Sequence, residues 1–155
     1  MKKTAKPIIL FCSMFLLLAL PAIGQEIELQ AANFSSGVFG SKNYEHLTFY
    51  VVNGRREKIL YSHGRSGRAK EIELTNLEVK TKGAVKSLKV RFPNDLILLI
   101  TPSGSTLRVT NEKGTYRKIF TWEYEGPVDG RGTWCDSCTQ DGRESVKLVK
   151  KYFLK

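Results

Sequence analysis

Apolar and polar residues alternate along most of this chain in short runs that end at turn residues, and this pattern constrains the fold most. Leu47, Phe49 and Val51 occupy every second position of one run, as in a strand with one buried face. The run ends at Asn53-Gly54, which favours a tight β-hairpin because both turn positions need positive φ. Similar runs recur about every 8 to 12 residues. The sequence therefore predicts a mainly β fold, an antiparallel sandwich or barrel of about seven to eight strands.

Individual segments fit this plan. We expect a first strand around 26–30 and a loop from Phe34 to Asn43, which is rich in glycine and serine. The next strand is marked by Ile72, Leu74, Leu77 and Val79, and an irregularity is expected in it near Thr75-Asn76. The continuous apolar run Leu96 to Ile100 predicts a buried central strand. Tyr116 to Tyr124 predicts a long strand.

The period changes at the C-terminus, where apolar residues fall at the helical spacings of three and four: Val146, Val149 and Phe153. Asp141 suits the N-cap position, and Glu144 follows three residues later as in a capping box. These features predict one helix over 141–154. Because a helix this short is marginal alone, we expect it to dock on the sheet.

The first 24 residues have the three parts of an export signal. Met1 to Lys6 carries three lysines and no acid, and an apolar run extends from Ile8 to Leu20. Ala22 and Gly24 are the small residues of a cleavage site. The opening resembles bacterial export signals.

We therefore expect segment 1–24 to be removed, which leaves a single β-rich domain over 25–155. This domain would be periplasmic or extracellular. The apolar run of the signal is too short for a membrane-spanning helix, so no transmembrane segment is expected after cleavage. Cys12 is not expected to accept a lipid, because the preceding Phe11 is too bulky for that processing site.

Two cysteines remain after cleavage, Cys135 and Cys138. Disulfides persist in exported proteins, so our main expectation is a structural disulfide between them. Three alternatives stay open: a redox-active dithiol, a metal half-site completed by His46 or His63, and free or intermolecular thiols. No second cysteine pair lies at zinc-site spacing, so no metal or cofactor is expected.

The segment Trp134-Cys135-Asp136-Ser137-Cys138 resembles the thioredoxin-type redox motif. A domain of that type needs strands and helices after its motif, whereas only 139–155 follow here. Asp136 would also oppose a neighbouring thiolate by like charge. We do not assign that family. Thiol–disulfide exchange, with Cys135 as nucleophile and Cys138 as resolving thiol, is the alternative function.

Basic residues are concentrated in two segments, 53–70 and 80–91, of a chain with net charge +10. If these segments are neighbours, they form a positive face that could hold an anionic protein, an anionic polysaccharide or the envelope surface. Nucleic acid is not expected, because export removes the protein from the cytosol and no nucleic-acid motif is present. The alternative is a solvated face with lysines guarding sheet edges. The binding candidates in the first segment are Arg55, Arg56, Arg65 and Arg68.

The loop 126–132 precedes the cysteines and holds three glycines and a proline. It is either a connection between the last strand and the helix or a binding loop that carries Asp129, Arg131 and Trp134.

Catalytic patterns fail on inspection. The segment Gly64 to Arg68 lacks the final glycine of a nucleophile elbow. Glu123 and Glu125 would share one strand face, where exposed glutamates are usually solvated. We therefore expect a non-enzymatic binding or interaction module of unknown ligand.

Overall fold

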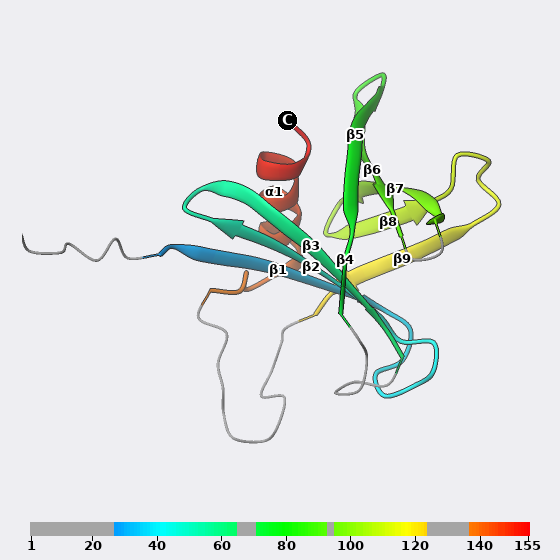
Figure 1. The fold of residues 1–155 in the computed structure, drawn as a ribbon, viewed down its shortest axis with the longest axis horizontal. Helices are drawn as coiled ribbons and strands as arrows, with labels where there is room; N and C mark the ends of the chain where they lie inside the picture. Colours follow the sequence, from blue (N-terminus) through cyan, green and yellow to red (C-terminus); the bar gives the residue numbers. More distant parts are fainter. Residues whose placement is uncertain (1–26, 65–70, 93–94, 124–136) are drawn as a thin grey trace, which may run out of the picture.

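The computed structural model describes residues 27–64, 71–92, 95–123 and 137–155. These residues form nine antiparallel strands in a nearly closed, barrel-like sheet, followed by one helix (Figure 1). The predicted mainly β fold with a C-terminal helix is confirmed, and the barrel is selected over the sandwich. The elements are β1 (Leu29–Ser36), β2 (Glu45–Val52), β3 (Arg55–His63), β4 (Ile72–Glu73), β5 (Thr75–Lys82), β6 (Val85–Arg91), β7 (Ile97–Ser103), β8 (Thr106–Thr110), β9 (Arg117–Trp122) and α1 (Gly142–Phe153).

The sheet has the order β4-β3-β2-β1-β9-β8-β7-β6-β5. It consists of two antiparallel meanders, the first formed by β1 to β4 and the second by β5 to β9. They join where β1 pairs with β9. At the opposite edge β4 pairs with β3 and β5 pairs with β6, and only Leu74 separates β4 from β5. The chain thus passes from one meander into the other with almost no connection, which brings the sheet round towards closure. The pairing shifts register between Asn76 and Glu78, as the predicted irregularity requires.

The hairpin β2–β3 turns at Asn53 and Gly54, with φ of 49° and 68°, as predicted.

The predicted bounds of the first strand, around 26–30, are wrong. β1 begins at Leu29 and ends at Ser36, so it includes Phe34 to Ser36, for which the sequence predicts a loop. Phe34 points into the core, and the polar residues beside it, Asn33 and Ser35, are also buried, so tertiary burial overrides their weak strand preference.

The prediction that the apolar run 96–100 is a fully buried strand is wrong, because only one of its faces is buried. Leu98 and Ile100 are fully buried, whereas Leu96 is 43% exposed and Ile97 is 37% exposed. β7 is therefore a strand with one core face. Its outward-facing Leu99 is half-buried for a different reason, because it lies on the floor of a surface groove.

Helix α1 packs its apolar side on the inward-facing side chains of the sheet. Phe153 meets Phe49 edge to face, with ring centroids 5.1 Å apart. The helix begins beside the β7–β8 turn, where a side chain on Gly142 would come within 2.6 Å of the Ser105 carbonyl oxygen. It ends near the start of β6, where Lys86 Nζ donates a 3.3 Å hydrogen bond to the carbonyl of Leu154. The β7–β8 turn and the β5–β6 turn both lie at one end of the barrel, which we call the helix end. The opposite end, where β2 and β9 begin, is the far end.

The start of α1 is capped as the sequence predicts. Asp141 accepts hydrogen bonds from the backbone amides of Arg143 and Glu144, at 2.7 and 2.8 Å. The Glu144 carboxylate accepts a hydrogen bond from the amide of Gln140 rather than from that of the N-cap.

In the described residues, no helix is long and apolar enough to cross a membrane.

Candidate functional site

A groove of about 910 Å³ lies on the outer face of the second meander. Side chains alternate between the two faces of a strand, and most of the strand residues in the groove lie between the core positions of β6 to β9. The described residues in its walls include four cations and one carboxylate. The lining residues are Lys80, Thr81, Lys82, Val85, Ser87, Leu99, Thr101, Arg108, Thr110, Asn111, Glu112, Gly114 and Arg117.

The centre of the groove is lined by hydroxyl groups and one apolar side chain. Ser87 and Thr101 face each other across β6 and β7, with their hydroxyl oxygens 2.7 Å apart. Thr110 pairs with Leu99 on the neighbouring strands. A polar surface of this kind offers hydrogen bonds to a ligand that also carries charge.

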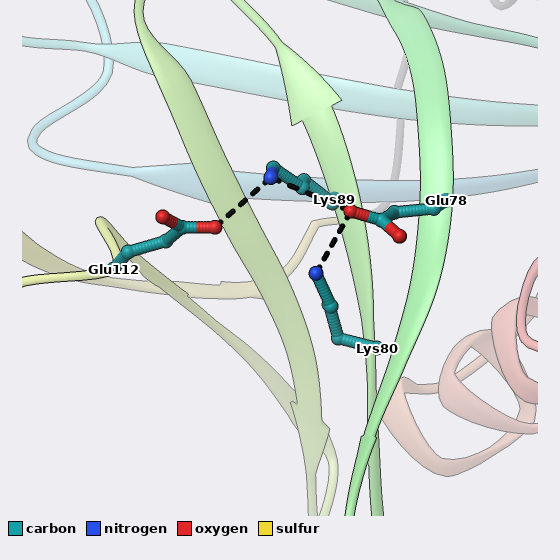
Figure 2. Close-up of polar contacts among 4 residues, drawn as sticks. All are labelled: Glu78, Lys80, Lys89 and Glu112. Carbon is teal, nitrogen blue, oxygen red and sulfur yellow. Dashed lines mark ion pairs between the residues drawn. The ribbon is translucent and has the colours of Figure 1, made fainter.

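An ion-pair network borders the groove (Figure 2). Glu78 Oε1 lies 2.9 Å from Lys80 Nζ and 3.4 Å from Lys89 Nζ, and Lys89 Nζ lies 3.0 Å from Glu112 Oε1. The hydrogen bond from Lys80 lowers the pKa of Glu78, and the bond from Lys89 lowers that of Glu112. The pKa of Lys89 is raised, chiefly by its hydrogen bond to Glu112. The network fixes the charges at the side of the groove.

Three other groove cations form no ion pair with any residue that the structure describes: Lys82, Arg108 and Arg117. Arg108 lies opposite Thr101 in the β7–β8 register, and Arg117 lies opposite Thr110 in the β8–β9 register. Guanidinium groups present paired N–H donors that match carboxylate, sulfate or phosphate oxygens. The groove can therefore hold an anion without breaking its own network.

A second charged cluster lies inside the far end of the barrel. Glu45 is 6% exposed and shares the inward face of β2 with Leu47 and Phe49. Its Oε2 lies 2.6 Å from Lys118 Nζ, and its Oε1 accepts a 3.1 Å hydrogen bond from the Tyr61 hydroxyl. No other donor in the described part of the chain reaches Oε2.

The environment of Glu45 alters the pKa of its neighbours. Burial raises the pKa of Tyr61 well above its ordinary value, and the charge and hydrogen bond of Glu45 add to this. Burial and the Glu45 charge also raise the pKa of Tyr116. For Lys118, burial works downward, but the bond to Glu45 and its charge outweigh burial, so the pKa is raised. The cluster therefore favours a protonated Lys118 beside neutral tyrosines.

Two basic candidates of the first segment, Arg55 and Arg56, are not among the residues that line the groove. Arg55 and Arg56 are exposed at the start of β3, beside the β2–β3 turn. In Figure 1 the tips of the β2–β3 and β5–β6 hairpins stand apart, with α1 between them in this view. Arg65 and Arg68 lie outside the described residues.

Cys138 is 6% exposed and lies in an extended segment beside β1. The amide of Ala31 donates to the carbonyl of Ser137, and the amide of Thr139 donates to the carbonyl of Ala31, both at 2.8 Å. Asn33 Nδ2 donates to the Cys138 sulfur at 3.2 Å. The cysteine is thus held against the sheet, before the helix cap.

A smaller groove of about 450 Å³ runs past Cys138, between β1 and α1. The other candidates from this region, Asp129, Arg131, Trp134 and Cys135, lie outside the described residues. The Cys135–Cys138 disulfide therefore stays a prediction.

His46 and Glu123 have structural partners, whereas His63 is exposed at the end of β3. His46 stacks on Tyr44, and its Nδ1 lies 3.4 Å from the Thr48 hydroxyl. The Tyr44 hydroxyl donates to Glu123. Within the described ranges, no group of three or more His, Cys, Asp or Glu residues is placed to hold a metal ion. Glu125 lies outside them.

Sequence reasoning missed Arg108, Arg117 and the Glu45–Lys118 pair. The buried pair leaves a signal, because each residue interrupts the apolar positions of an alternating strand: Glu45 precedes Leu47, and Lys118 precedes Phe120. The two arginines leave none on their own, because their proximity depends on how β8 pairs with its neighbours.

Comparison of this chain with protein-family models, with curated proteins and with solved structures found no match.

Proposed function

We propose that this protein is an exported, non-enzymatic binding module that holds an anionic ligand in the outer groove. The observation that carries the proposal is the placement of Lys82, Arg108 and Arg117 in one groove, without ion-pair partners among the described residues. Export is a prediction from segment 1–24. The predicted Cys135–Cys138 disulfide would brace the segment that runs beside β1.

The chemistry of the groove favours a ligand with several oxyanions. Two arginines and a lysine supply charge-assisted hydrogen bonds, and the hydroxyls of Ser87 and Thr101 supply neutral ones. An acidic protein segment or an anionic polysaccharide offers this combination.

A direct test compares two double variants that remove the same charge. Short poly-L-glutamate and dextran sulfate are titrated into the purified protein, and affinity is measured by calorimetry at low and at physiological salt. Arg108→Gln with Arg117→Gln should weaken binding of at least one of these probes about tenfold or more, because two charge-assisted hydrogen bonds are lost. Arg55→Gln with Arg56→Gln is the matched control at the β2–β3 hairpin.

An equal loss in both double variants would show that only net charge matters, and the groove proposal would then fail. It would also fail if neither probe bound the unaltered protein. A larger loss in the hairpin variant would move the site to Arg55 and Arg56.

A further inference from the structure

The strand β5 borders the groove and is the last strand in the sheet order. β3 pairs with β4 only at Ile72 and Glu73, and the amide of Leu74 donates to the Ile59 carbonyl at 2.8 Å. Beyond Leu74 the two meanders separate. In the part of the chain that the structure describes, no strand pairs with the side of β5 that faces away from β6.

The register of the β5–β6 hairpin identifies the unpaired backbone groups. Lys82 pairs with Val85 across a two-residue turn, and the residues that flank such a turn exchange hydrogen bonds. Because bonded and non-bonded pairs alternate, the backbone groups of Val79 and Thr81 point away from β6. Two residues at this spacing are what an added strand would pair with.

The side chains of β5 set the chemistry of such a strand. Lys80 and Lys82 face the groove, whereas Val79 is half-buried against the core. Side chains of an added strand lie beside those of the strand it joins. Alternate acidic residues would thus meet the lysines, and the residues between them would be apolar.

We infer that the open edge of β5 binds an extended polypeptide in which acidic and apolar residues alternate, by adding it to the sheet as a further strand. The inference rests on the proposed function and names the ligand class of that groove. Lysines on an edge discourage pairing with a second copy of the same edge, because like charges would lie together. The same lysines favour an acidic partner.

The test uses an acetylated peptide of alternating Glu and Val and the same peptide with N-methyl groups on alternate backbone amides. N-methylation removes the donors of a strand and keeps the charges. The unmodified peptide should bind at least about tenfold more tightly than the methylated one. Amide exchange at Val79 and Thr81 should slow in the complex.

A variant of the protein provides the reciprocal test. Val79→Pro removes one outward-facing N–H, which the sheet itself does not use, and should weaken the unmodified peptide about as much as N-methylation does. Val79→Thr is the matched control, because it keeps the N–H and the β-branched shape. Val79 does not line the groove, so the affinity for dextran sulfate should be the same in all three proteins.

The outcomes separate the two claims. Equal binding of both peptides, with loss in the Arg108→Gln and Arg117→Gln variant, would overturn strand addition and leave the anion-binding groove. Binding of dextran sulfate but of neither peptide would do the same. Dimerisation of the protein through β5 without peptide would overturn the acidic partner. If no anion binds, both claims fail.

Discussion

The two charged clusters of this molecule use the same chemistry in opposite surroundings. Glu45 and Lys118 form an ion pair inside the far end of the barrel, where the carboxylate is almost fully buried. The network of Glu78, Lys89 and Glu112 lies on the outer face, and its carboxylates are about half exposed. A buried charge must keep its partner, whereas exposed charges exchange partners at little cost. The inner cluster is therefore suited to stability and the outer one to binding.

Removing the buried carboxylate should have the largest effect on stability. Glu45→Ala leaves Lys118 without its partner and Tyr61 without its acceptor, and should lower the free energy of unfolding by about 3 kcal/mol. This value is at the low end for a buried pair, because Lys118 is partly exposed. Urea denaturation at neutral pH measures the change. Glu112→Ala is the control on the outer face and should leave the urea midpoint unchanged; equal losses would abolish the contrast between the clusters.

The inner cluster should also give the protein a specific alkaline sensitivity. The pKa values of Tyr61, Tyr116 and Lys118 are all raised in the folded state. A group with a raised folded pKa contributes stability that is complete below its unfolded pKa and is lost as pH rises through the folded value. Stability should therefore fall above about pH 10.

Tyr61→Phe separates this effect from general alkaline unfolding. The variant loses one hydrogen bond, which should cost about 1 kcal/mol at neutral pH. Because it no longer titrates, its stability should fall less steeply above about pH 10. Urea midpoints measured across this range provide the comparison, and identical slopes for the two proteins would remove Tyr61 from the explanation.

A smaller effect is expected when a network acid on the outer face is neutralised. Glu112→Gln removes the one carboxylate among the described residues that line the groove, and it leaves Lys89 with one of its two ion-pair partners. Affinity for poly-L-glutamate should rise about twofold or more at low salt. The gain should shrink as salt is added, because exposed charges are screened. An unchanged affinity at low salt would show that the network does not compete with the ligand.

The sequence allows the fold to be predicted further than the site. Alternation and turn chemistry act locally, so the Asn53-Gly54 hairpin and the Asp141 cap could be read directly. The course of β1 could not, because Asn33 and Ser35 become strand residues only when other parts of the chain cover them.

The groove depends on pairing between strands that are separated in sequence. Lys80 and Lys82 belong to a segment whose positive charge is visible in the sequence, but Arg108 and Arg117 join them only across β6, β7 and β8. Arg55 and Arg56 carry the same charge signal and lie on another hairpin. Charge content therefore supports only the proposal of an anionic ligand, and the sheet register is needed to show which charges lie in one groove.

The most direct measurement follows the arginine side chains of isotope-labelled protein by NMR while short poly-L-glutamate is added. The groove proposal predicts that the Nε–H signals of Arg108 and Arg117 shift together and saturate, while those of Arg55 and Arg56 stay in place. Shifts confined to Arg55 and Arg56, or spread evenly over all four side chains, would contradict it.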